Sequence, residues 1–150
     1  MPMSAAARLA RHLEYLDAAE MAALSDRAGV QRKIGARARV GRKVNATAYL
    51  LLCSAVAIDV ATDARVLDGR PSAGSSIVWW IFGSALFLTR SRRRLDLRSA
   101  ADLVGVSAAT LSRAERGQPI AIESYLRVVE FIGVQPESFL SFTETPTATP

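Results

Sequence analysis

The chain is similar to itself when it is shifted by 76 positions, and this internal similarity constrains the fold more than any other feature. Residues 26–58 then align with residues 102–134 without a gap, and eight of the 33 aligned pairs are identical. The identical pairs are Asp26/Asp102, Gly29/Gly105, Val30/Val106, Arg37/Arg113, Ala38/Ala114, Gly41/Gly117, Tyr49/Tyr125 and Leu50/Leu126. A duplicated fold must keep its turn glycines and core apolar residues. The pattern predicts two units of one fold; the alternative is chance similarity between two helical stretches rich in Ala and Arg.

Apolar residues follow helical spacing in four stretches, and no stretch of the sequence shows sustained alternation of apolar and polar residues. The sequence therefore predicts an all-α fold. Residues 63–76 gather Gly, Pro and Ser, which is typical of a linker. The Thr- and Pro-rich end predicts a disordered tail. We predict a first domain at residues 1–62, a linker at 63–75, a second domain at 76–142 and a tail at 143–150.

The charge balance favours an acidic partner. The 150 residues include 19 Lys and Arg against 14 Asp and Glu, and half of all residues are hydrophobic, which is enough for a packed core. A small basic protein of this kind is expected to bind nucleic acid or an anionic membrane surface.

The sequence lacks the residues that several functional classes require. Cys53 is the only cysteine and lies in an apolar run, which predicts a buried small side chain and excludes an internal disulfide. His12 is the only histidine, so a metal site is not expected. The sequence has no phosphate-binding Gly-rich loop, no GxSxG and no plausible Ser-His-Asp set. We therefore expect no enzyme activity, no cofactor and no metal.

The apolar run IVWWIFGSALFLT at residues 77–89 precedes a cluster of arginines and raises the question of a membrane segment. It holds 13 residues, whereas a spanning helix needs roughly 20. We predict no membrane partner and a buried helix that also forms an interface; the alternative is a membrane anchor. Its apolar residues exceed what one small bundle buries on one helix face, so we expect this helix to join the two halves or two chains. The expected interface residues are Trp79, Trp80, Phe82 and Phe87.

The second half carries the signals of two short helices joined by a tight turn. Asp96 and Ser107 are good N-caps, and Gly105 and Gly117 suit helix ends. Ala101 is small where the two helices cross. The residues spaced to fill the core are Leu103, Val106 and Leu111 between these helices, and Tyr125, Leu126, Val129 and Ile132 on the next one. Two short helices around a Gly-Val-Ser turn predict a helix-turn-helix.

Residues 86–140 resemble the five-helix DNA-binding domain of the phage-repressor/Cro family, also called XRE-type. The resemblance is carried by Leu95, Ala101, Gly105-Val106-Ser107, Leu111-Ser112-Arg113, Glu115-Arg116-Gly117 and the helix at residues 125–134. It implies sequence-specific binding of duplex DNA, with the third helix of the domain in the major groove. Together with the internal similarity, it predicts tandem five-helix lambda-repressor-like helix-turn-helix bundles, the first copy being divergent.

The resemblance places the second recognition helix at residues 107–116. Its expected DNA-facing residues are Ser107, Ala108, Ala109, Thr110, Ser112 and Arg113, and the expected phosphate contacts are Arg98, Arg116 and Gln118. Arg113 is the best candidate to read a guanine; the alternative is a solvated or phosphate-bound charge. The arginines at 90, 92, 93 and 94 are expected to form a solvated helix end.

The first copy places its recognition helix at residues 31–40, where positive charge concentrates. Its expected DNA contacts are Gln31, Arg32, Lys33, Arg37, Arg39, Arg42 and Lys43. Residues 27–58 contain no acidic side chain. A charge run is often only a solvated face, but this one coincides with the element assigned to DNA. Leu111 aligns with Gly35, while Ile34 lies one place early, which predicts a rotated or overwound helix.

We expect a transcription regulator, a repressor, that binds a duplex-DNA operator as a homodimer in the cytoplasm, at the nucleoid. The first alternative is an antitoxin or anti-activator that binds a protein partner through its apolar surface. The second is a helical interaction or membrane-associated protein without a DNA role.

Overall fold

The computed structural model describes residues 3–56 and 76–141, and the regular elements in these ranges are helical. They comprise eight α-helices and one short 3-10 helix. The β-type pairing in these ranges is limited to an isolated bridge between Ile77 and Leu140. The all-α expectation is therefore confirmed. The predicted linker at 63–75 and the predicted tail at 143–150 lie outside the described residues.

The N-terminal half, residues 3–56, contains four helices. They are α1 (Ala5–Leu13), α2 (Ala18–Ala28), α3 (Arg32–Arg39) and α4 (Ala46–Ala55). The Asp17 side chain accepts from the backbone N–H of Glu20, and the Glu20 side chain accepts from that of Asp17, so a capping box begins α2. Asn45 caps α4 through the N–H of Ala48, at 2.8 Å. Local sequence therefore determines where α2 and α4 begin.

The C-terminal half, residues 76–141, contains four further helices and a final short turn of helix. They are α5 (Trp79–Arg92), α6 (Leu97–Val104), α7 (Ala108–Glu115), α8 (Ile122–Ile132) and the 3-10 helix η1 (Pro136–Phe139). Asp96 caps α6 and Ser107 caps α7, as the sequence predicts. Among the described residues, no helix combines the length and apolar character that crossing a membrane requires.

The helices of the two halves correspond at the same shift of 76 positions. Helix α3 matches α7 at both ends, and α4 and α8 begin at matching residues. Gly29 and Gly105 both have positive φ, of 74° and 87°, at the end of the preceding helix. The packing corresponds as well, because α3 contacts α1 and α2 as α7 contacts α5 and α6. The internal similarity of the sequence is thus accompanied by matching local structure.

The buried apolar residues of both halves form one hydrophobic core, which includes the two matched tyrosines. Tyr49 and Tyr125 are both buried, as are Cys53 and Leu111. Leu103 does not join this core, because its side chain is 61 % exposed. The prediction that Leu103 fills the space between the two helices is wrong. Helix α6 buries Ala100 and Ala101 instead, and a residue two positions later points to the opposite side of a helix.

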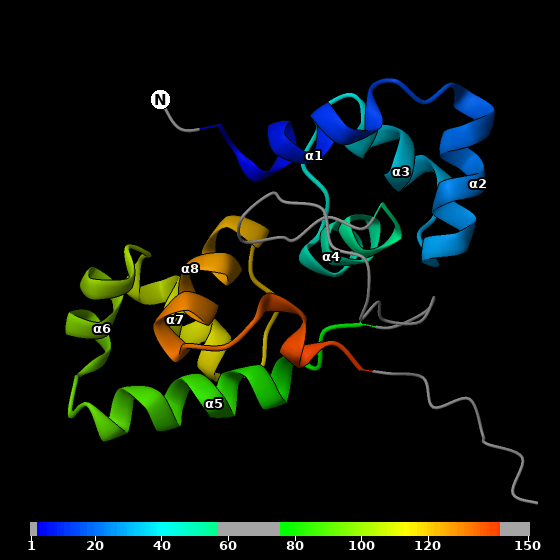
Figure 1. Ribbon diagram of the computed structural model, residues 1–150. Helices are drawn as coiled ribbons and strands as arrows, with labels where there is room; N and C mark the ends of the chain where they lie inside the picture. The colour runs from blue at the N-terminus through cyan, green and yellow to red at the C-terminus, as the bar shows by residue number, and fades with distance from the viewer. Residues whose placement is uncertain (1–2, 57–75, 142–150) are drawn as a thin grey trace, which may run out of the picture.

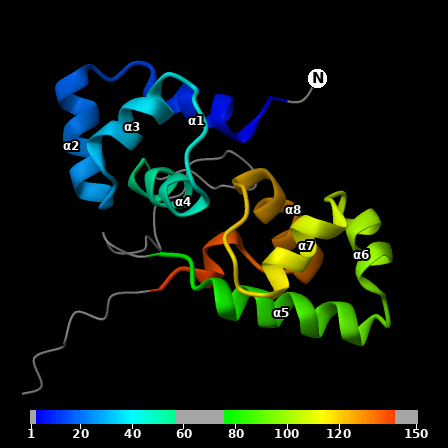
Figure 2. The same cartoon turned by 180° about the vertical axis from the view of Figure 1, so that it is seen from behind.

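The two halves meet through α4 and α8. Figures 1 and 2 show the halves as two lobes, with α4 next to α8 and α5 along the edge of its lobe that faces away from α1–α3. Residues 48–53 of α4 are all buried, as expected of a helix covered on every side. The backbone N–H of Ala5 donates to the Glu123 carboxylate of α8, which adds a polar link. The aromatic segment contributes at its start, where the backbone N–H of Ile77 donates to the Thr47 hydroxyl of α4 at 3.3 Å, but the main joint is formed by α4 and α8, which corrects the expectation that the aromatic helix forms it.

Helix α5 instead buries one side against its own lobe and exposes the other. Phe82 is fully buried in edge-on contact with Phe139 and in tilted contact with Tyr125. Trp79 is half-buried and packs edge-on against Phe82 and Tyr125. Phe82 therefore belongs to the core and is not available to an interface, which corrects its assignment. Trp80 and Phe87 remain exposed.

Candidate nucleic-acid interface

The turn between α6 and α7 is held by both caps and backbone bonds. Asp96 accepts from the backbone N–H of Ser99 at 2.7 Å, and this bond lowers the pKa of the Asp96 carboxyl. Ser107 accepts from the N–H of Thr110 at 3.1 Å. The N–H of Val106 donates to the carbonyl of Ala101, which closes the glycine turn. The two helices therefore have fixed ends, and the exposed start of α7 follows directly from the turn.

The turn between α2 and α3 repeats this backbone geometry with a weaker cap. The N–H of Val30 donates to the carbonyl of Ser25 at 2.9 Å, which matches the Val106 bond. Gln31 stands at the N-cap of α3 and makes no side-chain capping bond. The exposed end of α3 thus begins with a side chain that is not used to hold its own helix.

Gly35 allows α3 to pack closely on α2. A Cβ at this position would lie 1.9 Å from the Ser25 hydroxyl oxygen, which itself donates to the Met21 carbonyl. Helix α3 buries Gly35 and Ala38 where α7 buries Leu111 and Ala114. Equivalent positions of α3 and α7 therefore face the interior. The expectation of a rotated or overwound α3 is wrong.

Most cations predicted on and after α3 lie on the surface. Exposed side chains are those of Gln31, Arg32, Lys33, Arg37, Arg42 and Lys43, whereas Arg39 is half-buried. Arg32 binds Asp26 with two hydrogen bonds, of 2.6 and 3.0 Å. This guanidinium lowers the pKa of the Asp26 carboxyl. Within the described residues, the side chains of Lys33, Arg42 and Lys43 have no ion-pair partner, so their charge faces solvent.

Arg37 and Arg113 make equivalent contacts in the two halves. Arg37 donates to the carbonyl of Lys43 at 3.3 Å, and Arg113 donates to that of Pro119 at 3.1 Å. Both bonds span the glycine turn that follows the helix. The identity of these two arginines therefore has a structural explanation that the sequence analysis missed. Both side chains remain exposed, so each keeps further donors available.

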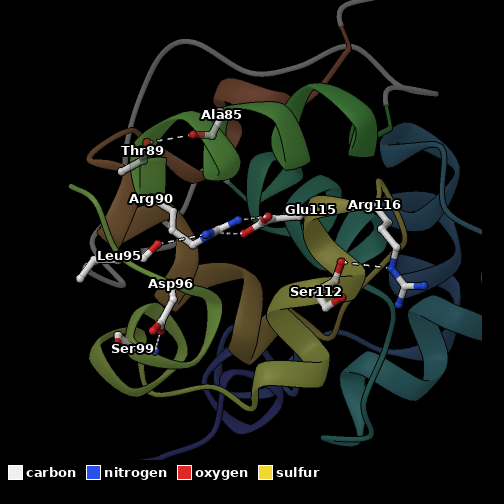
Figure 3. Close-up of polar contacts among 9 residues, drawn as sticks. All are labelled: Ala85, Thr89, Arg90, Leu95, Asp96, Ser99, Ser112, Glu115 and Arg116. Atoms are coloured by element: carbon white, nitrogen blue, oxygen red, sulfur yellow. Dashed lines mark hydrogen bonds and ion pairs between the residues drawn. The ribbon is translucent and has the colours of Figure 1, made fainter. Parts of the chain in front are cut away.

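The remaining residues predicted on and around α7 form a mostly small, weakly charged surface. Arg98, Ser107, Ala109, Arg116 and Gln118 are exposed, and Ala108, Thr110 and Ser112 are half-buried. The Ser107 hydroxyl also lies 2.8 Å from that of Thr110. Figure 3 shows Arg116 donating to the Ser112 carbonyl of its own helix, at 3.3 Å. The α7 surface thus offers small side chains at its start and cations at its end.

The arginines that end α5 do not all form a solvated surface. Figure 3 shows Arg90 reaching from α5 to Glu115 on α7, with bonds of 2.7 and 2.9 Å. These side chains are only 17 % and 12 % exposed, and the pairing raises the pKa of Arg90. Arg93 lies over the Phe131 ring at 4.5 Å from its centre. The expectation of a solvated helix end is therefore wrong for Arg90, which fixes α7 against α5, whereas Arg93 remains exposed while it contacts the Phe131 ring of α8.

Arg127 is a positioning residue that the sequence analysis did not single out. It lies on α8 and donates to the carbonyl of Gly105 at 2.6 Å. It thereby links α8 to the turn between α6 and α7. Its place on a helix next to apolar residues gave no signal of this contact, since the partner is a backbone atom.

The two candidate helices lie on one side of the molecule. In Figure 2, α3 and α7 both lie toward the viewer, one in each lobe. No protein-family model matches this chain, and no curated protein matches it in sequence. The functional assignment therefore depends on the residues and their geometry.

Proposed function

We propose that this chain is a sequence-specific duplex-DNA-binding transcription regulator of the XRE type, made of two helix-turn-helix units. The units correspond to the domains predicted at residues 1–62 and 76–142. One observation carries the proposal: α3, which exposes a run of cations, has the same place in its helix pair as α7 has in its own. In this proposal the helices at residues 31–40 and 107–116 enter the major groove, and the protein acts as a repressor.

The charge on and after α3 suits the phosphate backbone. Lys33, Arg42 and Lys43 are exposed, and residues 27–58 contain no acid that could neutralise them locally. Cations that replace counterions on phosphates supply most of the non-specific affinity of DNA-binding proteins. We assign Arg42 and Lys43, which follow the helix, to phosphate contacts that hold the unit on the duplex.

Base reading is assigned to the exposed starts of the two helices. Gln31 lies at the start of α3 and is exposed, and an amide can bind adenine through two hydrogen bonds. Ala109 and Thr110 lie in the first turn of α7 and offer methyl groups that suit thymine. Arg113 keeps donors beyond its bond to Pro119, so contact with a guanine or a phosphate is compatible with its structural role.

The proposed regulator needs no catalytic group or cofactor and works on the nucleoid, in the cytoplasm. A tandem chain brings two reading helices to one operator without a partner. Single units of this type commonly bind as dimers, with reading helices one DNA turn apart. We include a homodimer in the proposal, which gives four reading helices and a longer operator.

Duplex binding at different salt concentrations tests the electrostatic part of the proposal. We expect Arg42→Ala/Lys43→Ala to weaken binding to all sequences alike, and to reduce the slope of log affinity against log salt by about 2. The control Arg11→Ala/Arg92→Ala removes the same charge from exposed sites on α1 and α5 and should leave the slope nearly unchanged. Affinity that is independent of salt, or no duplex binding at low salt, would contradict the proposal and favour a helical protein without a DNA role.

Selection from random duplex DNA tests the sequence-specific part. Two half-sites in the selected fragments are expected if α3 and α7 both read bases. One half-site assigns α3 to phosphate contact alone. The absence of any enriched sequence contradicts specific recognition.

A second candidate function is an antitoxin or anti-activator that binds a protein partner. The exposed aromatic side chains of Trp80 and Phe87 favour it, because large exposed apolar patches mark protein contacts. This function predicts that one defined neighbour co-purifies with the chain, and that Trp80→Ser abolishes this without changing duplex binding.

A further inference from the structure

The outward side of α5 carries a continuous apolar stripe. Its large side chains, Trp80, Ile81, Phe87 and Leu88, are 69 %, 41 %, 50 % and 52 % exposed. With two exposed serines they recur at intervals of three and four residues, which places them on one side of the helix. We call this set the α5 stripe: Trp80, Ile81, Ser84, Phe87, Leu88 and Ser91. The opposite side of α5 is used by its own lobe, so the stripe is a separate surface.

We propose that two copies of this chain pair through the α5 stripe, with the two α5 helices antiparallel and a two-fold axis at Ser84. The inference deepens the proposed function, because it assigns a surface to the homodimer included there. The stripe has the symmetry that such pairing requires. Trp80 and Ile81 precede Ser84 by four and three residues, and Phe87 and Leu88 follow it by three and four. Each large pair therefore meets the other large pair of the second copy, as in an isologous interface.

The polar groups of the stripe do not oppose its burial. The Ser84 hydroxyl donates to the Trp80 carbonyl at 2.9 Å, within its own helix. Residues 77–89 contain no charged side chain. The first charge that follows, Arg90, reaches inward to Glu115. Pairing therefore removes apolar area from water without burying an unpaired charge, which is the arrangement of stable interfaces.

The area of the stripe is sufficient for a dimer. Its exposed side chains offer about 500 Å² per copy, which is at the upper end for the largest apolar patch of a monomer. Complete burial of the stripe in two copies removes at most roughly 1,000 Å² from water, which is the lower limit of the size expected of a biological interface. The small Ser84 at the centre allows the two helices to approach closely, and the aromatic side chains on both sides lock their register.

Light scattering on the full chain, over a range of concentrations, tests the pairing. We expect a mass of two 16.1 kDa chains, and we expect Leu88→Asp to raise the dimer dissociation constant about 100-fold, because it places a charge among the apolar side chains of the interface. The control Leu103→Asp alters a leucine of α6 that is 61 % exposed and should leave the mass unchanged. Thermal unfolding of both variants checks that the fold is retained.

Cross-linking tests the position of the axis. Ser84→Cys is expected to give a covalent dimer with a short bis-maleimide, whereas Ala109→Cys on α7 and the unmodified chain are expected to give none. A single-chain mass at every concentration overturns the pairing, as does a dimer that Leu88→Asp leaves intact. A single-chain mass combined with capture of a different protein through the stripe also overturns it.

Duplex binding by the same samples separates this inference from the proposed function. A chain that is monomeric but binds duplex DNA contradicts the pairing and leaves the DNA role in place. A chain that dimerises through the stripe but binds no duplex contradicts the DNA role and leaves the pairing in place.

Discussion

The two halves of the molecule use one backbone plan with different side chains in the same places. Both end a helix at a glycine with positive φ, and both close the next turn with an arginine, Arg37 or Arg113. They differ in what holds the third helix of each half. Helix α7 inserts Leu111 into the core, whereas α3 presents Gly35 and moves close to α2. The backbone plan therefore tolerates two packing solutions, provided that the facing residue changes size as well.

The halves also differ in how their charges are used. Arg90 and Glu115 form a largely buried pair between α5 and α7. A shift of 76 positions leads from these residues to Glu14 and Arg39, so the charge signs are exchanged at the matching places. The C-terminal half thus holds an ion pair inside that fixes its helices, whereas most of the cations in both halves lie on the surface. Removing one partner of the buried pair would leave the other charge buried and unpaired, whereas the exposed cations are the ones that the proposed function assigns to an anionic partner.

Substitutions of the residues that pack α3 and α7 into place, Gly35 and Leu111, should change the free energy of unfolding most. Gly35→Leu introduces side-chain atoms where a single Cβ already lies 1.9 Å from the Ser25 hydroxyl oxygen. We expect a loss of about 3 kcal/mol in the free energy of unfolding, because the backbone must move. Leu111→Ala should cost a similar amount, about 3 kcal/mol, through the cavity it leaves. Urea unfolding measures both.

A double-mutant cycle identifies the cause of the first effect. Gly35→Ala alone should cost about 2 kcal/mol, and most of this should be recovered in a Ser25→Ala background, which copies the alanine found at residue 101. An unchanged cost in that background would show that the Ser25 hydroxyl does not limit the approach of α3.

Breaking one ion pair in each half should show that the loss of a buried pair lowers the free energy of unfolding more than the loss of an exposed pair. Glu115→Gln removes the carboxylate from Arg90, and we expect a loss of about 2 kcal/mol because the guanidinium stays mostly buried. Asp26→Asn breaks the pair with Arg32 on the surface, where water screens both charges, and should leave the unfolding free energy almost unchanged. Equal effects of the two variants would contradict this distinction.

Alkaline pH should destabilise both halves through their matched tyrosines. Burial raises the pKa of Tyr49 and Tyr125 above the ordinary value of 10.0. The stability that this provides is present below pH 10 and is lost as the pH rises through the folded-state pKa values. At about pH 11 we expect a loss of about 1 kcal/mol per tyrosine. Tyr125→Phe should lose the bond to the Pro136 carbonyl and about half of this pH dependence in urea unfolding; an unchanged dependence would argue against Tyr125 as its source.

The local parts of the fold could be predicted from the sequence because they depend on adjacent residues. Asp96 and Ser107 cap their helices as expected, and Gly105 ends α6. The joint between the halves was not predicted, although α4 carried a signal for it. Five apolar residues follow one another from Tyr49 to Cys53, and a helix that is apolar on all sides must be covered on all sides.

The long-range parts depend on which neighbour each side chain meets, which the spacing does not determine. Leu103 has the spacing of a core residue but faces solvent. The apolar residues of α5 lie all around the helix, so their spacing does not show that Phe82 is buried while Phe87 is exposed. The candidate site shows the same limit. The sequence indicated that Arg37 and Arg113 matter, but their contacts are with backbone carbonyls six residues away, which side-chain patterns do not reveal.

The helix caps offer the smallest test of the comparison between the halves. The Asn45 side chain caps α4, whereas Ala121 stands at the matching N-cap of α8 without a capping bond. Asn45→Ala should cost about 1 kcal/mol, and Ala121→Asn should add about 0.5 kcal/mol, because the backbone at both N-caps is already extended. Thermal unfolding measures the two shifts, which should have opposite signs. A loss of stability in Ala121→Asn would instead show that the start of α8, beside Glu123 and the N-terminal lobe, has no room for a longer side chain, so that contact between the lobes outweighs local capping there.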